Sequence, residues 1–293
     1  MFNSLKFKVI LFGFIFTFFS SFGQSYFLGL FNSSIREALS ITHGQFGSIY
    51  ASATLCSSLL LIWVGKKIDD VNIFKFAFFV TVLLSFACFF FSRITSVFLL
   101  FVAIFLMRFS GQGMMSHTAS TTISRYFTRT RGKALSISWF GLSSAEFIMP
   151  VLMVYLLTII DWQNLWLIFS ITVLIVLPIA SFLLIKNLNL DSREANDENI
   201  KEVEIKQWKR IEVIKDYRFY IISSNMLAMP WIFTGFAVFQ SFVQTSKGWG
   251  PYVIAQSFMS YSILSVLTLF LSGFLIDKFT SRKLLIYMNI PLL

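Results

Sequence analysis

Two charged side chains stand alone inside long uncharged stretches of the sequence. Arg108 falls in an apolar run near 96–119, and Glu146 falls in another near 134–158. At about 1.5 Å per residue, Arg108 lies roughly 18 Å after the start of its run and Glu146 lies roughly 18 Å before the end of its run. A charge at mid-bilayer costs between about 3 and 17 kcal/mol, so it persists only beside a partner or a wet cavity. The pattern therefore predicts two opposite charges at one depth on consecutive antiparallel helices.

This pair of charges has two interpretations. An ion pair between Arg108 and Glu146 could close an empty site and then release the guanidinium to an anionic ligand. Alternatively, the two groups only neutralise each other between packed helices. Glu146 is also a candidate to carry a proton, because carboxyl groups within membranes act in proton relays.

Several uncharged polar side chains inside apolar runs are weaker candidates for ligand contacts. Such residues bond neighbouring helices about as often as they bind solutes, so both roles stay open. The candidates are Gln24, Tyr26, Tyr50, Asn225 and Gln240.

The two histidines, His43 and His117, have no second histidine or acid at metal-ligand spacing. We therefore expect no metal site and no cofactor. Thr42 and Gln45 have the spacing of a capping box, which predicts a helix start there and leaves His43 on the surface.

The elements that position these residues follow from the composition. The chain has 293 residues, of which 56% are apolar and 13% are charged, and this excludes a soluble fold. Lipid offers no hydrogen bonds to a bare backbone, so long apolar stretches must be helices. An all-α polytopic membrane protein is expected, with spans near 9–31, 45–64, 74–92, 96–119, 134–158, 164–185, 219–245 and 252–275 and part of a ninth near 284–293.

The basic residues indicate the orientation. Of the 24 Lys and Arg residues, only Arg36, Arg93 and Lys247 fall in one alternate set of gaps, and Arg108 falls in a span. The positive-inside rule therefore predicts a multi-pass protein of the cell inner membrane with a cytoplasmic N-terminus. The net charge of +10 is spread over short loops, so we expect the lipid bilayer as a partner and no nucleic acid.

One connection, residues 187–218, is long and hydrophilic, and it predicts three parts of the chain. These are a six-helix transmembrane bundle over 1–186, a cytoplasmic linker over 187–218, and the start of a second bundle over 219–293. Within the linker, apolar residues share one helical side and predict either an amphipathic helix on the membrane surface or a solvated tether. They are Ile200, Val203, Trp208, Ile211 and Ile214.

The second span and the eighth span share a pattern at an offset of 208 residues. Gly65 and Asp69 in the first copy correspond to Gly273 and Asp277 in the second. Two parallel six-helix repeats joined by a cytoplasmic linker are the layout of one large transporter class. Under that layout the chain ends inside its ninth helix, so the second bundle has about three helices here.

These loop residues resemble the Gly-x-x-x-Asp motif that follows the second and eighth helices in the major facilitator superfamily. The resemblance implies the fold of that family and a latch for one conformation. The latch residues would be Gly65, Asp69, Gly273, Asp277, Lys278 and Arg282. In the first copy Asp70 and Asn72 replace the usual base and glycine, which predicts a weaker latch.

A finer resemblance concerns the monocarboxylate and oxalate–formate branch of that family. Arg125-Tyr126-Phe127 followed by Arg131-Gly132-Lys133-Ala134 is similar to the junction common there. The fifth helix lacks the family's glycine-rich exchanger signature, with Ala145 and Met149 at the expected glycine positions, and this favours symport. The resemblance implies a secondary transporter that moves a small organic anion with a proton.

Two other classes of function are alternatives to transport. A polytopic enzyme needs clustered His, Asp or Ser at one membrane face, and the sequence has none, so no enzyme is expected. A transporter-like sensor or partner-binding subunit stays open, because a fold does not fix a function. We expect a monomer that binds a small solute and transports it by alternating access.

Overall fold

The computed structural model of the chain describes residues 4–127, 130–186, 210–279, 281–287 and 289–290. Within these ranges the chain forms helices and no strand. In chain order the elements are α1 Ser4–Ser20, η1 Ser21–Gly23, α2 Ser25–Leu30, α3 Asn32–Leu39, α4 His43–Val64, η2 Gly65–Asp69, α5 Ile73–Phe91, α6 Val97–Met107, η3 Arg108–Met115, α7 Ser116–Tyr126, α8 Arg131–Leu156, α9 Trp162–Ile185, α10 Arg210–Lys215, α11 Tyr217–Val238, α12 Gln240–Ser246, α13 Pro251–Phe279 and α14 Ser281–Tyr287.

The eight predicted spans are confirmed. Eight helical stretches of the described residues are long and apolar enough to cross a membrane. The predicted ninth span begins in α14, and residues 291–293 lie outside the described part. Large apolar side chains cover the outside of these helices, as expected for contact with lipid, and Leu183 on α9 is an example.

Polar side chains define several helix starts. Thr42 and Gln45 form the predicted capping box, in which the Gln45 amide N–H donates to Thr42 Oγ1 at 3.2 Å. The Thr42 N–H donates in return to Gln45 Oε1 at 2.8 Å. Asn72 and Ser96 accept amide N–H bonds in the same manner at the starts of α5 and α6. These caps satisfy backbone donors that a helix start leaves free.

The first and fourth spans each contain an interruption, where the sequence predicts continuous helices. In the first span, η1 is a 3-10 turn and Gln24 has an extended backbone. In the fourth span, η3 is a π-helix that begins at Arg108. The two interruptions touch, because a Cβ built on Gly23 would lie 2.8 Å from Gly111 Cα. Glycine is needed at both positions for this approach.

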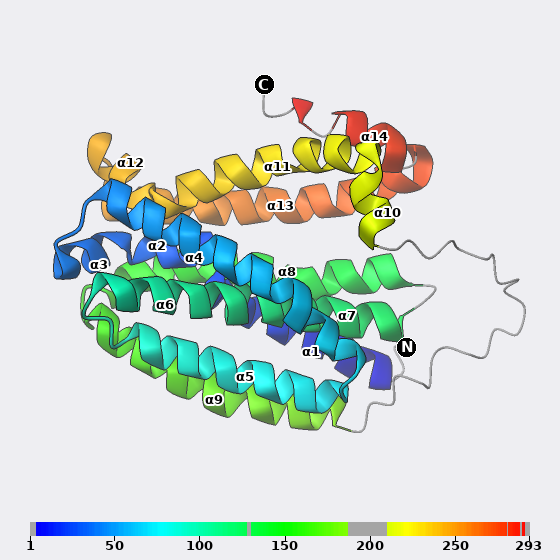
Figure 1. The fold of residues 1–293 in the computed structure, drawn as a ribbon, viewed down its shortest axis with the longest axis horizontal. Coiled ribbons are helices and arrows are strands. Elements are labelled where there is room, and N and C mark those ends of the chain that lie inside the picture. Colours follow the sequence, from blue (N-terminus) through cyan, green and yellow to red (C-terminus); the bar gives the residue numbers. More distant parts are fainter. Residues whose placement is uncertain (1–3, 128–129, 187–209, 280, 288, 291–293) are drawn as a thin grey trace, which may run out of the picture.

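The helices lie roughly parallel in a bundle (Figure 1). α5 packs on α9 along one side, and α11 and α13 lie along the opposite side (Figure 1). α8 packs against both α1 and α13, so it joins the first six spans to the last two. A cluster of rings around the buried Trp166 fills the core between α2, α5 and α9.

The predicted amphipathic helix of the linker is described only in part. Ile200, Val203 and Trp208 lie outside the described residues. Ile211 and Ile214 lie in α10, and both side chains are more than half exposed.

Candidate functional site

The guanidinium of Arg108 is held by the interruption in the first span. Arg108 is 6% exposed, and its Nη1 donates to the Gly23 carbonyl at 2.9 Å and to Ser25 Oγ at 3.2 Å. The guanidinium carbon also lies 5.4 Å from the centre of the Tyr50 ring. Tyr50 donates its hydroxyl to the same Ser25 Oγ at 2.9 Å. Three spans therefore position one buried cation.

The other nitrogens of Arg108 have no hydrogen-bond partner among the described residues. Nε is fully enclosed by the protein, whereas Nη2 is not fully enclosed. A guanidinium carries five donors in a fixed planar fork, so fixing Nη1 orients Nη2 as well. The arrangement leaves Nη2 able to donate to an anion.

Glu146 does not pair with Arg108 in this structure, so the predicted ion pair is absent. The Glu146 side chain is 8% exposed, and within the described part of the chain its carboxylate has neither a hydrogen bond nor an ion pair. α1 and α8 run side by side, with Thr17 Oγ1 donating to the Ser138 carbonyl at 2.5 Å. Counting about 1.5 Å per residue from that contact places Glu146 at a height similar to that of Gly23, the partner of Arg108.

Two tyrosines lie on helices that pack against α8, the helix of Glu146. They are Tyr26 of α2 and Tyr261 of α13. The Tyr26 and Ser21 hydroxyls are both buried and lie near each other, and neither has another partner among the described residues. A ligand oxygen would therefore stabilise these hydroxyls further.

Tyr261 was not singled out in the sequence. Its ring stacks on Phe233 of α11 at 5.2 Å between centroids, and Phe258 contacts Tyr26 at 5.6 Å. Tyr261 and Phe258 are three residues apart and therefore share one side of α13. That spacing was the signal available in the sequence, and it places an aromatic wall from the last two spans beside Glu146.

The remaining predicted candidates are spread over the molecule. Gln24 is half-buried at the extended residue after η1. Asn225 donates to the Leu285 carbonyl at 2.9 Å and accepts from Asn289. It therefore joins α11 to α14 and to the residue that follows shortly after α14. The structure therefore brings Arg108, Tyr50, Tyr26 and Glu146 toward one region, and Asn225 lies elsewhere.

The end of the bundle that carries α3 and α12 is closed by contacts between the first spans and α11–α12. Asn32 Nδ2 donates to the Val238 carbonyl at 2.7 Å, and Gln240 Nε2 donates to the Tyr26 carbonyl at 2.8 Å. A Cβ on Gly29 would overlap the Ala237 carbonyl oxygen, so the backbones touch there. We call these contacts the closed end.

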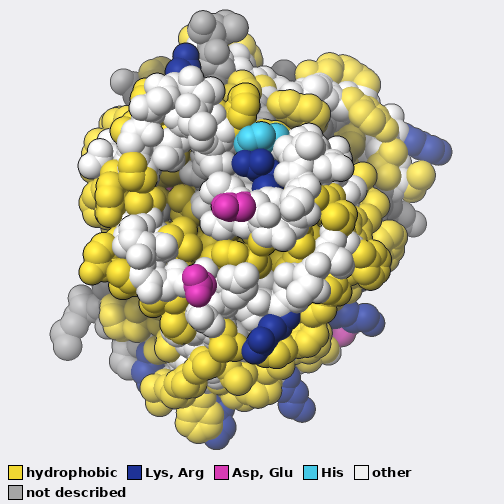
Figure 2. Space-filling view, turned by 90° about the vertical axis from the view of Figure 1, so that its left-hand side faces the viewer, with side chains coloured by type: hydrophobic (Ala, Val, Ile, Leu, Met, Phe, Trp, Pro, Cys, Tyr) yellow, Lys and Arg dark blue, Asp and Glu magenta, His cyan; other side chains and the backbone are white. Residues whose placement is uncertain are grey.

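His43 also lies at the closed end. It was expected on the surface, where its ring is partly exposed and packs edge-on against Phe242 at 4.9 Å. Figure 2 looks onto this end, where apolar and uncharged atoms dominate and acidic and basic side chains are scattered among them.

The opposite end of the fourth span holds the first copy of the predicted latch. Asp69 forms an ion pair with Arg125, and Arg125 Nη1 also donates to the Ile68 carbonyl at 3.2 Å. His117 Nε2 lies 2.9 Å from the Gly65 carbonyl oxygen. In the second copy, Gly273, Asp277 and Lys278 lie in α13 and Arg282 lies in α14, but their side chains are outside the described part.

No group of three or more His, Cys, Asp or Glu side chains in the described ranges could hold a metal ion. The central residues offer instead one cation, one carboxylate and phenols. These groups can bind an anion and exchange a proton.

Comparisons with known proteins agree with this architecture. The sequence profile of the Major Facilitator Superfamily matches residues 13–293. A search of curated protein sequences found no match. The fold is similar to a crystal structure of a bacterial homologue of the human lysosomal transporter Spinster in an inward-facing and unoccupied conformation, with a TM-score of 0.70 and 16% identity. That alignment covers 96% of this chain and 64% of the other, so this chain spans less than two thirds of the similar protein. Since the family profile spans nearly the whole sequence, the chain belongs to the major facilitator superfamily.

Proposed function

We propose that this protein is a secondary active transporter that moves a small organic anion, such as a monocarboxylate, together with a proton. In this proposal the six-helix bundle of residues 1–186 and a second bundle that starts at 219 rock about a central site. Residues 187–218 connect them on the cytoplasmic side of the inner membrane.

The observation that carries the proposal is the half-satisfied guanidinium of Arg108. Nη1 is bonded to the Gly23 carbonyl and Ser25, whereas Nη2 has no partner among the described residues. A buried cation without a counter-ion persists only where a cavity or ligand compensates it. A substrate carboxylate would supply that compensation, and the buried Tyr26 hydroxyl could donate to it as well.

Proton coupling follows from the position of Glu146. An anion bound between Arg108 and Tyr26 would bring a second negative charge near the Glu146 carboxylate. Like charges in a poorly solvated region repel strongly, so the two are accommodated together when Glu146 is protonated. One proton would then accompany one anion.

Alternating access is supported by the closed end. The two backbones meet there through Asn32, Gln240 and Gly29. These are side-chain to backbone bonds and a glycine contact, which can separate without breaking a helix. With a cytoplasmic N-terminus, the closed end would face outward, as an inward-facing state requires.

Membership of the monocarboxylate and oxalate–formate branch is part of the proposal. Arg125 of the junction motif forms an ion pair with Asp69 and donates to the Ile68 carbonyl. It would therefore stabilise the loop and not bind substrate. Arg108 would remain the single substrate-binding cation of the fourth span.

Binding of small monocarboxylates to the purified full-length protein tests the proposal. We expect an acetate, lactate or benzoate series to raise the melting temperature of the wild type, more at acidic than at alkaline pH. Arg108→Gln should abolish this stabilisation, and Glu146→Gln should keep it while removing the pH dependence. Equal stabilisation of the wild type and a folded Arg108→Gln variant would refute the anion site.

A further inference from the structure

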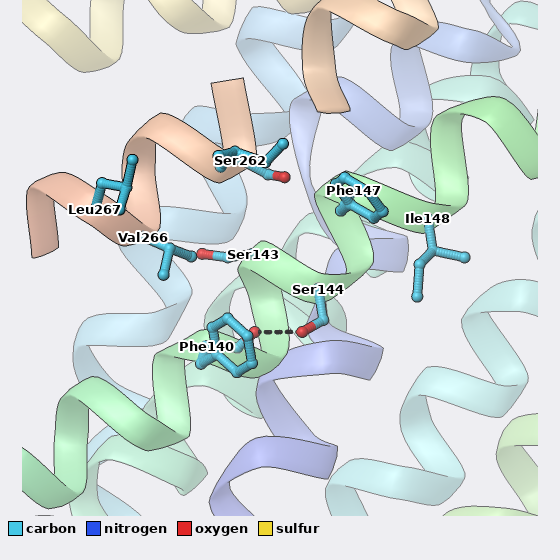
Figure 3. A pocket seen from close by; sticks show the side chains of 9 residues that line it. Phe140, Ser143, Ser144, Phe147, Ile148, Ser262, Val266 and Leu267 are labelled. Atoms are coloured by element: carbon cyan, nitrogen blue, oxygen red, sulfur yellow. Dashed lines mark hydrogen bonds between the residues drawn. The ribbon is translucent and has the colours of Figure 1, made fainter. Parts of the chain in front are cut away.

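A groove of about 300 Å³ lies between α8 and α13, away from the proposed transport site. Its walls come from Phe140, Ser143 and Phe147 on α8 and from Ser262, Ile263 and Val266 on α13. Figure 3 shows Ser143 of α8 and Val266 of α13 facing each other between the two helices. The first six spans contribute one wall and the eighth span contributes the other.

The groove lies at mid-membrane depth. Ser143 lies near the middle of α8, and Ser262 and Val266 lie near the middle of α13. At that depth in a spanning helix the surrounding medium is the hydrocarbon core. Phe140 and Ile263 on the rim are 44% and 52% exposed, so this side of the seam is not covered by described residues.

The transport site lies on the other side of the same seam. Consecutive residues of a helix are about 100° apart, so Phe147 and Ser262 point in other directions than their neighbours Glu146 and Tyr261. Glu146 is 8% exposed, whereas Phe147 is 36% exposed. The groove is therefore separate from the region around Arg108.

The walls of the groove are mostly apolar, which favours a hydrocarbon as its occupant. Ser144 donates its hydroxyl to the Phe140 carbonyl at 2.8 Å, as the dashed line in Figure 3 shows. Ser262 donates to the Met259 carbonyl at 3.0 Å. These hydroxyls are satisfied by their own helices, which leaves Ser143 as the free polar group of the walls. Water has too few partners here, and an empty groove would forfeit packing contacts.

We infer that the groove binds one acyl chain of a bilayer phospholipid. Because its two walls belong to different parts of the protein, the chain acts as a wedge at the seam between α8 and α13. Its occupancy depends on the spacing of these helices. The inference concerns the lipid-facing side and holds whether or not the protein transports an organic anion.

Photo-crosslinking tests this site in the full-length protein. The protein is placed in nanodiscs of phosphatidylcholine containing an analogue with a diazirine in the middle of one acyl chain, and labelled peptides are identified by mass spectrometry. We expect label concentrated on Ser143, Phe147 and Val266. Val266→Trp fills the groove and should remove this label, and Ser143→Leu should reduce it.

Ile175→Trp is the matched control, because Ile175 is 54% exposed on the lipid-facing side of α9. It should leave the label on α8 and α13 unchanged. Label spread evenly over α5, α9 and the seam in the wild type would overturn the inference, and this readout does not depend on any variant. Displacement of the label by the monocarboxylates that stabilise the protein would also overturn it, because the groove would then belong to the transport path.

Discussion

Replacing Asn32 by alanine should open the closed end of the molecule. Asn32 is fully buried, and its amide donates to the Val238 carbonyl across the contact between the first and seventh spans. Its Oδ1 accepts from Arg36 Nε at 2.8 Å, which fixes the orientation of the amide. Asn32→Ala removes the donor and leaves a buried carbonyl without that partner.

The size of the effect follows from this single bond. A buried polar group that loses its partner costs about 1–3 kcal/mol. The cost falls only on the state in which the closed end is assembled, because in the open state water can reach the carbonyl. A bias of about 1–3 kcal/mol corresponds to a shift of about 5- to 150-fold in the ratio of open to closed molecules.

Thiol accessibility measures this ratio directly. The chain has two cysteines, so Cys56→Ala and Cys88→Ala give a background without thiols. Val238→Cys then places a reporter at a position that is 3% exposed in this structure. A membrane-impermeant maleimide should label the reporter about 5- to 150-fold faster when Asn32→Ala is added.

Two further variants sharpen the test. Asn32→Asp keeps an acceptor for Arg36 but not the donor to Val238, so it should accelerate labelling at least as much. Asn225→Ala also removes a side-chain bond to a carbonyl, that of Leu285, but away from the closed end, and it should change nothing. An unchanged labelling rate in folded Asn32→Ala and Asn32→Asp proteins would contradict the assignment of Asn32 to the closed end.

Other predictions concern packing and the loops. Gly141→Ala should destabilise the protein by a few kcal/mol, because the added Cβ would overlap the Phe14 carbonyl oxygen, whereas Gly132→Ala meets nothing within 4 Å and should be neutral or stabilising in thermal unfolding. The reverse ranking of the two melting temperatures would contradict the α1–α8 packing. Asp69→Asn should lower the free energy of unfolding by no more than about 1 kcal/mol, because Asp69 and Arg125 are 51% and 32% exposed. A much larger loss in chemical denaturation would mean that the ion pair is shielded from solvent.

The membrane architecture could be predicted from the sequence because hydropathy fixes it. Eight apolar stretches became eight helices, and the Thr42–Gln45 spacing gave the cap that the structure contains. The family was also recognisable, since its loop residues keep a fixed spacing around Gly65 and Asp69. These features are local or repeat along the chain.

The interruptions could not be predicted because they depend on contacts between spans. Ser21-Phe22-Gly23 reads as continuous helix, and no proline marks the break. The 3-10 turn exists where Gly23 meets Gly111 and where its carbonyl accepts from Arg108. The same carbonyl holds Nη1 of Arg108 at the first span, a contact that the sequence did not indicate.

The aromatic wall that the last two spans contribute to the site could not be predicted for a similar reason. Phe258 and Tyr261 resemble ordinary lipid-facing aromatics in a chain with 37 phenylalanines. Only their packing on Tyr26 and Phe233 separates them from the rest. Asn32 was also not singled out, since its place after the first apolar run reads as a polar loop.

Uptake by proteoliposomes tests the central claim most directly. The full-length wild type should accumulate a radiolabelled monocarboxylate when a proton gradient is applied, and collapse of the gradient should stop the uptake. Arg108→Gln should abolish uptake while the protein still inserts and keeps its Val238→Cys labelling pattern. Undiminished uptake by Arg108→Gln would contradict a mechanism centred on this guanidinium.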